Sequence, residues 1–316
     1  MNRGLAAAIL LVLALPALAQ EKAPASAPPT QAKPAGPVDL AYGAYERGFY
    51  LTAFKEATIR AGQKDPAAMT LLGELYAQGL GVPHDDAKAA QWYRLAVQND
   101  DANAMFALAM FAMQGRGGMS DRSEAVRLLE QAAKLKHPLA AYDLGLLYLQ
   151  GQQVNQDFKR AAELFQQSAD LGNAEAEYAL ATMYKEGRGV AKDVAKAALL
   201  LAKSSIAGNL DAMVEFGIAQ FNGTGTPQDE TRAAQLLLKA AQRGSPIAQD
   251  RIARVLMAGR GLPANPTEAI KWHIIAKAGG AGDPDLDVFA SRQPPDVREA
   301  ADKAAKKWLS TIAALR

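Results

Sequence analysis

The amino-acid sequence predicts an all-α protein, a solenoid of about seven 36-residue antiparallel helix pairs closed by a C-terminal capping helix. Three sets of small residues recur at intervals of 36 positions and carry this prediction: Gly79, Gly115, Gly151, Gly187, Gly223 and Gly259; Ala68, Ala104, Ala140, Ala176, Ala212 and Ala248; Ala89, Ala125, Ala161, Ala197, Ala233 and Ala269. A fixed period of this length indicates a repeat protein, whose units bury their apolar faces against one another.

The N-terminal segment, residues 1–19, has the pattern of a secretory signal peptide. A positive start at Arg3, an apolar run from Leu5 to Leu15 and a small-x-small site ending at Ala19 predict cleavage after Ala19. The apolar run is shorter than the roughly 20 residues that span a bilayer, which disfavours a membrane anchor. We therefore expect an exported protein, periplasmic in a Gram-negative host, with no transmembrane segment in the mature chain.

Residues 20–37 are rich in proline and alanine and hold no large apolar residue, so we expect a disordered linker. The chain has no cysteine, which excludes disulfides and thiolate chemistry. Its net charge of +2 over 316 residues, without interleaved aromatic and basic residues, argues against a nucleic-acid partner.

The solenoid is predicted over residues 38–286, with a degenerate opening unit from Val38 to Gly62. In the next unit the first helix is predicted over residues 67–78, because apolar residues recur there at helical spacing. Gly79 and Gly81 then end this helix, since glycine takes the left-handed conformation of a helix C-terminus without strain.

The second helix of each unit is predicted to begin after a recurring polar residue that suits an N-cap: Asp85, Asp121, Asp157, Asp193, Asp229 and Asn265. Its alanine column and a following bulky pair, such as Trp92 and Tyr93, are expected to pack between units. In the last segment, residues 287–316, an apolar stripe through Val297, Ala301 and Trp308 predicts a capping helix, which covers the exposed end of a solenoid.

The quoted units resemble the Sel-one-like repeat family, relatives of the tetratricopeptide repeats. The motifs that carry the resemblance are Ala-x-x-x-Leu-Gly-x-x-Tyr from Ala68, Gly-x-Gly-Val from Gly79 and Asp-x-x-Lys-Ala-x-x-Trp-Tyr from Asp85. The resemblance implies a right-handed superhelix that serves as an adaptor in protein assembly. Some exported, cysteine-rich relatives are described as penicillin-binding proteins or weak β-lactamases, but this chain lacks their cysteines.

No arrangement of residues predicts catalysis. The three histidines, His84, His137 and His273, lie in separate units without the spacing of metal ligands, and no Ser-x-x-Lys or His-Glu-x-x-His motif occurs. We therefore expect no enzyme activity, no cofactor and no metal.

A groove for a protein or peptide is predicted on the first helices, which should line the concave side. Two positions on these helices, which the repeat does not fix, are apolar in most of the middle units, with Thr182 and Lys185 as the exception: Met110 and Met113, Leu146 and Leu149, Ile218 and Phe221. Methionine suits an adaptable binding surface. The alternative is that tight winding of the superhelix buries these side chains.

The sequence thus predicts an exported, non-catalytic scaffold with a protein or peptide partner in the cell envelope. Two other functions stay open at this point. One is the negative regulation of an envelope sensor, and the other is binding or weak hydrolysis of cell-wall material.

Overall fold

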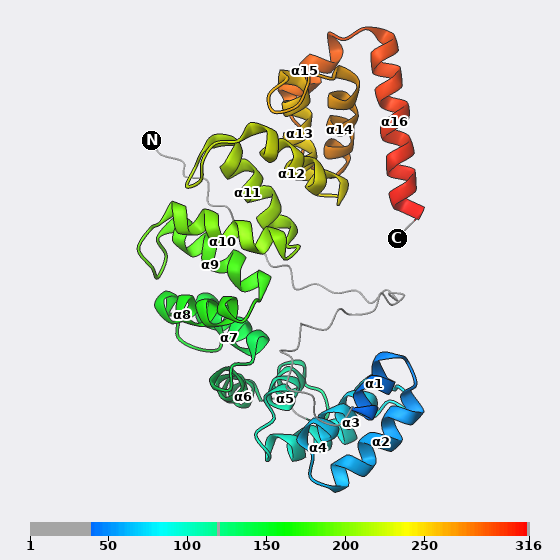
Figure 1. Cartoon of the computed structure of the whole chain (residues 1–316), viewed down its shortest axis with the longest axis vertical. Helices are drawn as coiled ribbons and strands as arrows, with labels where there is room; N and C mark the ends of the chain where they lie inside the picture. The colour runs from blue at the N-terminus through cyan, green and yellow to red at the C-terminus, as the bar shows by residue number, and fades with distance from the viewer. Residues whose placement is uncertain (1–38, 119–120, 315–316) are drawn as a thin grey trace. The chain divides into compact units, whose positions relative to one another are not determined.

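The computed structural model describes residues 39–118 and 121–314, and every regular element in these ranges is a helix. The predicted signal peptide and linker lie outside the described residues. The helices belong to one compact unit, Leu40–Arg316, in which each helix from α1 to α14 packs against the next along the chain (Figure 1). The all-α prediction and the pairing of the helices are confirmed.

Seven helix pairs form the repeated part of the described chain. The first helices of the pairs are α1 (Leu40–Glu46), α3 (Pro66–Gln78), α5 (Ala102–Gln114), α7 (Pro138–Gln150), α9 (Ala174–Glu186), α11 (Leu210–Asn222) and α13 (Pro246–Ala258). The second helices are α2 (Tyr50–Gly62), α4 (Asp86–Val97), α6 (Arg122–Lys134), α8 (Phe158–Asp170), α10 (Val194–Ile206), α12 (Glu230–Gln242) and α14 (Pro266–Ala278).

The polar column before each second helix caps it as predicted. In every unit from α4 to α14 the side chain of this residue accepts a hydrogen bond from a backbone amide of the first turn. The first helices carry a second capping column, not recognised from the sequence: Asp65, Asp101, His137, Asn173, Asn209 and Ser245. Each unit therefore fixes both of its helix starts with side chains.

Removing one cap should weaken the fold measurably. The Asp157 side chain accepts from the Arg160 amide at 2.9 Å and makes no other hydrogen bond or ion pair with the described residues. We expect Asp157→Ala to lower the free energy of unfolding by about 1 kcal/mol in urea denaturation. Asp157→Asn keeps the acceptor, so it should cost only a small fraction of that amount, and an equal loss in both variants would contradict the capping role.

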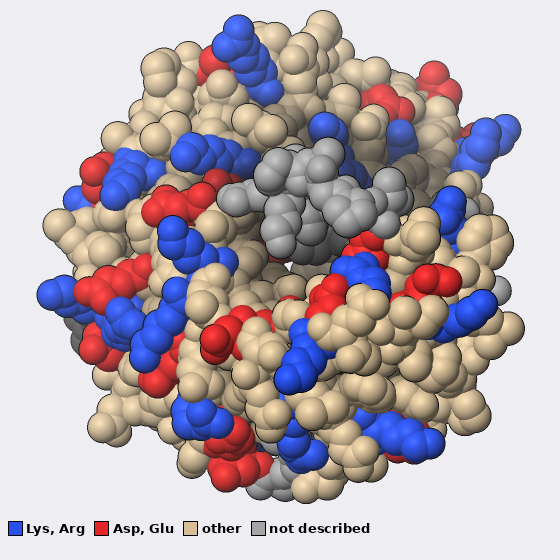
Figure 2. Space-filling model, turned by 60° about the horizontal axis from the view of Figure 1, so that its bottom comes forward, with Lys and Arg blue, Asp and Glu red and all other residues tan. Residues whose placement is uncertain are grey.

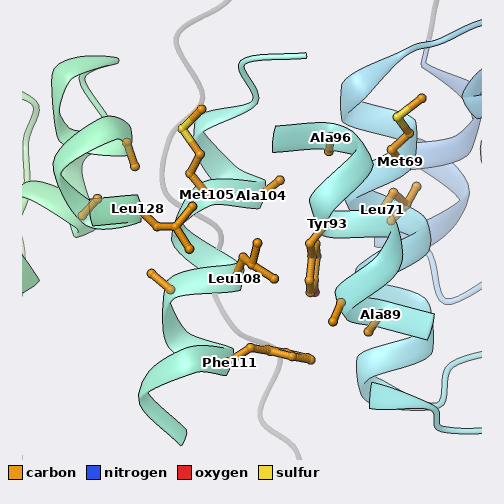
Figure 3. Close-up of a cluster of buried hydrophobic side chains, with 14 of the residues drawn as sticks. Met69, Leu71, Ala89, Tyr93, Ala96, Ala104, Met105, Leu108, Phe111 and Leu128 are labelled. Carbon is orange, nitrogen blue, oxygen red and sulfur yellow. The ribbon is translucent and has the colours of Figure 1, made fainter. Parts of the chain in front are cut away.

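Successive units are joined through the second helix of one pair and the first helix of the next. Tyr93 of α4 packs edge-on against Phe111 of α5, with 5.4 Å between the ring centroids (Figure 3). At the turn after each first helix the chain also approaches the preceding second helix. There Arg116 donates to Asp86 of α4 at 2.6 Å. An apolar contact and a polar contact thus hold this junction.

The small-residue column on the second helices lies fully buried. It contains alanine in most units but serine at positions 168 and 204, where each hydroxyl donates to a carbonyl of the first helix of its own pair, Pro138 or Ala174, at 2.7 Å. A larger side chain would not fit between helices this close.

Two further helices follow the last pair, α15 (Pro284–Ser291) and α16 (Pro295–Ala314). The sequence analysis did not foresee α15. The apolar stripe of α16 packs against α14, where Trp308 lies 5.9 Å from Trp272 between ring centroids and Ala301 is fully buried. Of the helices described, none combines the length and the apolar character that crossing a membrane requires.

Candidate binding surface on the first helices

The six residues predicted to line the groove are all partly buried. Their side chains therefore keep some contact with solvent while they pack against the core. Met110 and Met113 lie against the N-terminal core cluster, Leu146 and Leu149 against the middle one, and Ile218 and Phe221 against the C-terminal one. On each helix the two positions are three residues apart, so they share a face.

A polar network lies beside this face between α9 and α11. The Tyr178 hydroxyl donates to Glu215 at 3.0 Å, and the Lys185 ammonium donates to the other oxygen of the same carboxylate at 2.6 Å. Burial, and then the nearby Glu215 carboxylate, raise the pKa of Tyr178 well above its ordinary value. At neutral pH this network is therefore a neutral phenol and a satisfied ion pair, and it gives no reactive group.

A cleft of about 450 Å³ lies along α11. Its lining runs from Asp211 to Asn222, nearly the whole helix, and its floor comes mainly from apolar side chains of α10 and α11. This volume falls within the roughly 300–1,000 Å³ typical of ligand sites.

A second cavity of about 230 Å³ lies between α11 and α13 and shares Ile218 and Asn222 with the first cleft. Phe221 also lines it, together with three arginines, Arg251, Arg254 and Arg260. The structure thus brings Ile218 and Phe221 into one site, whereas neither cavity includes the other four predicted residues. Sequence reasoning missed the arginines because it looked only for apolar positions.

Two largely buried titratable groups lie at the start of α7 and within it. His137 caps the helix by accepting from the Ala140 amide at 3.1 Å, and its ring stacks on Phe106 at 4.7 Å. Burial lowers the pKa of His137 to about 4. Burial likewise raises the pKa of Asp143 to about 6, and this carboxylate makes no hydrogen bond or ion pair with the described part of the chain.

These two groups should give opposite pH dependences of stability. Unfolded His137 takes up a proton near pH 6.5 and folded His137 only near pH 4, so its contribution is lost as the pH falls through this window. Folded Asp143 takes up a proton near pH 6 and unfolded Asp143 near 3.8, so its contribution is gained as the pH falls. Each effect is at most about 3 kcal/mol.

We therefore expect His137→Asn, which keeps a capping side chain, to become more stable relative to the parent protein as the pH falls from 7 to 4. Asp143→Asn should become less stable relative to the parent protein over the same fall in pH. Urea denaturation at several pH values measures both variants. Parallel pH profiles for the parent and both variants would contradict the assigned pKa values.

The remaining two histidines lie in different environments, one buried and one exposed. His273 is buried in α14, with Nε2 2.8 Å from a carboxylate oxygen of Asp287, which also binds Lys277. His84 lies in a turn, with Nε2 3.4 Å from Asp86. Among the residues described, no three histidine or acidic side chains are grouped to hold a metal ion. On the face seen in Figure 2 the two signs of charge are interspersed rather than gathered.

Comparison with known proteins identifies the family of these repeated units. A family model described as Sel1 repeat matches six consecutive segments, residues 66–101, 102–137, 138–173, 174–209, 210–245 and 246–280. The solved Sel1 repeat protein from Oxalobacter formigenes is 27% identical, with a TM-score of 0.63, covering 75% of this chain and 94% of that one. Another solved structure is c5321, a protective antigen present in uropathogenic Escherichia coli strains displaying an SLR fold. It is 24% identical, with a TM-score of 0.57 over 86% of this chain and 67% of that one. The comparison with curated proteins found no match.

Proposed function

This chain belongs to the Sel1 repeat family, and from that premise we propose that it is an exported, non-catalytic scaffold that binds a protein or peptide partner. The repeat scaffold is a fold typical of protein–protein interaction, and its relatives are generally not enzymes. The proposed binding surface is the face of the first helices that carries Met110, Met113, Leu146, Leu149, Ile218 and Phe221.

The observation that carries this proposal is the partial burial of all six side chains. A solvent-facing position of a repeat that has no partner is free to be polar, yet three of the units place two apolar residues there. Apolar side chains that recur on one face and stay partly accessible favour a contact surface for another chain. Of the titratable groups described above, Glu215 is engaged by Lys185 and Tyr178, and burial holds His137 neutral at neutral pH, which favours binding over chemistry.

Export to the periplasm is proposed from the sequence alone, on the pattern of residues 1–19. It predicts a mature chain that begins at Gln20. Sequencing the N-terminus of the protein purified from the periplasm of a Gram-negative host tests this prediction directly. A chain that retains Met1, or that stays in the cytoplasm, would contradict it.

The binding proposal is tested by crosslinking and affinity purification from envelope extracts. The parent protein is compared with a variant carrying Met110→Glu, Leu146→Glu and Phe221→Glu. Circular dichroism first establishes that this variant keeps its helix content. We expect the parent to retain a specific protein that the folded variant loses, because three carboxylates cannot be desolvated against an apolar partner.

A control variant with three outward-facing substitutions on second helices, Lys159→Glu, Lys203→Glu and Lys239→Glu, should keep the partner. An unchanged set of partners in the first variant would move the binding surface away from the first helices. Recovery of glycan alone would overturn the proposal in favour of cell-wall binding.

A further inference from the structure

The junction between α10 and α11 lacks the large side chain that fills the other junctions. One column of the first helices is buried in the other units and reads Leu75, Phe111, Leu147, Met183, Ala219 and Val255. Phe111 reaches Tyr93 across its junction. At the equivalent place Ala219 is only partly buried and, together with Leu201, lines the cleft of about 450 Å³. The missing side-chain volume explains why the cleft opens here.

The rim of the same junction is also reduced. At three of the other junctions an arginine after the first helix contacts the start of the preceding second helix: Arg116 binds Asp86, Arg260 binds Glu230, and Arg188 lies over the Phe158 ring at 5.3 Å. Leu80 and Gln152 hold this position at the remaining two. At the α10–α11 junction the corresponding residues are Thr224 and Val194, and both line the cleft. Val194 is left 40% exposed. The small side chain at the core position, Ala219, and the absence of a charged pair at the rim positions, Thr224 and Val194, both leave this junction less filled.

An arginine that has no polar partner among the described residues lines the cavity next to the cleft. Arg251 lines the adjoining cavity, is exposed, and makes no hydrogen bond or ion pair with the residues that the structure describes. The other two arginines of that cavity are engaged, Arg254 with Asp283 and Arg260 with Glu230. The site therefore combines a mainly apolar cleft, whose lining also holds the exposed Asp211 and the Lys185–Glu215 ion pair, with one positive charge beside it that the described residues leave unpaired.

We propose that this site binds an extended peptide segment that carries a bulky apolar side chain and, two residues later, an acidic side chain. The inference rests on the proposed function and names the chemistry of the partner. The cleft follows α11 along its length, which suits an extended chain rather than a compact ligand. In an extended chain, residues i and i+2 point to the same side roughly 7 Å apart. On this proposal the apolar side chain enters the cleft, whose lining includes Ala197, Leu201 and Ala219, and the carboxylate points toward the adjoining cavity that Arg251 lines.

The test uses the pentapeptide acetyl-Ala-Trp-Ala-Asp-Ala-amide as the probe. Methyl NMR of the full chain labelled at isoleucine follows Ile218, which lines both cavities, with exposed Ile59 of α2 as an internal reference. We expect a saturable shift at Ile218 and none at Ile59. The shift should vanish when alanine replaces tryptophan in the probe, and the affinity should fall up to about fivefold when asparagine replaces aspartate.

Ala219→Leu restores the residue found at Leu75 and Leu147, so it should fill the cleft, keep or raise the melting temperature and abolish the shift. Ala219→Met, which copies the residue at Met183, is the alternative cleft-filling variant if leucine proves too large. The control variant is Ala67→Leu, at an exposed position of α3, which should bind the probe like the parent protein. Arg251→Gln should reduce the affinity as much as the asparagine probe does. An unshifted Ile218, or a shift that survives in a folded cleft-filling variant, overturns the site.

The outcome separates this inference from the proposed function. A partner that is lost by the triple glutamate variant but kept by Ala219→Leu would overturn the cleft alone. A probe that binds a chain which captures no protein from extracts would instead overturn the scaffold proposal. Equal affinities for the aspartate and asparagine probes would overturn the role of Arg251.

Discussion

Phe165→Ala should lower the free energy of unfolding by about 3–5 kcal/mol, among the largest losses expected from one substitution in this protein. Phe165 is fully buried in α8 and packs against Tyr142, 5.7 Å away between ring centroids. It also occupies the space opposite Gly145, where a Cβ atom would come within 2.7 Å of the ring. Truncation therefore leaves a cavity that the two helices cannot close by moving together without breaking other contacts.

Leucine is the matched control, because the same position holds Leu129, Leu201 and Leu237 in other units. Phe165→Leu should cost about 1–1.5 kcal/mol, since most of the apolar volume stays. Urea denaturation followed by circular dichroism measures both variants. Similar losses for alanine and leucine would show that the ring itself, rather than the volume it fills, decides the packing.

Gly189→Ala should cost at least about 2 kcal/mol, although it adds one methyl group. The backbone at Gly189 has φ +72°, a conformation that side chains disfavour, and an added Cβ would overlap the carbonyl oxygen of Phe158. That oxygen belongs to the start of the preceding second helix, so relief of the clash would require the two units to separate. The substitution should therefore weaken the junction as well as strain the turn.

Gly172→Ala separates the two causes. This glycine has φ +84°, but an added methyl group would meet no atom within 4 Å, so only the backbone strain remains and the expected cost is about 1 kcal/mol. Thermal unfolding of the two variants gives the comparison. If both lost the same stability, the close approach between Gly189 and Phe158 would have no energetic weight.

Much of the fold was predictable because the repeat period makes each unit evidence for the others. The glycine column located the ends of the first helices, and the polar column at Asp85 and its equivalents located the starts of the second helices. Both depend on local backbone chemistry, which a single sequence records. The 36-residue interval then placed these elements in every unit.

The candidate site was less predictable because it depends on departures from the repeat. Ala219 and Thr224 look unremarkable alone, and their effect follows only from the large residues that other units place there. Arg251 matters through the absence of a described partner, which no sequence pattern records. The pKa values of His137 and Asp143 likewise arise from burial, which depends on tertiary packing that helical spacing does not give.

The central claim is that the first helices present the surface that contacts a partner. Site-specific photocrosslinking in the native host tests it most directly, with benzoylphenylalanine placed at Leu149 on α7 or at Lys159 on the exposed side of α8. The account predicts a discrete crosslinked protein from position 149 and none from position 159. Crosslinking from position 159 alone, or the same products from both positions, would contradict it.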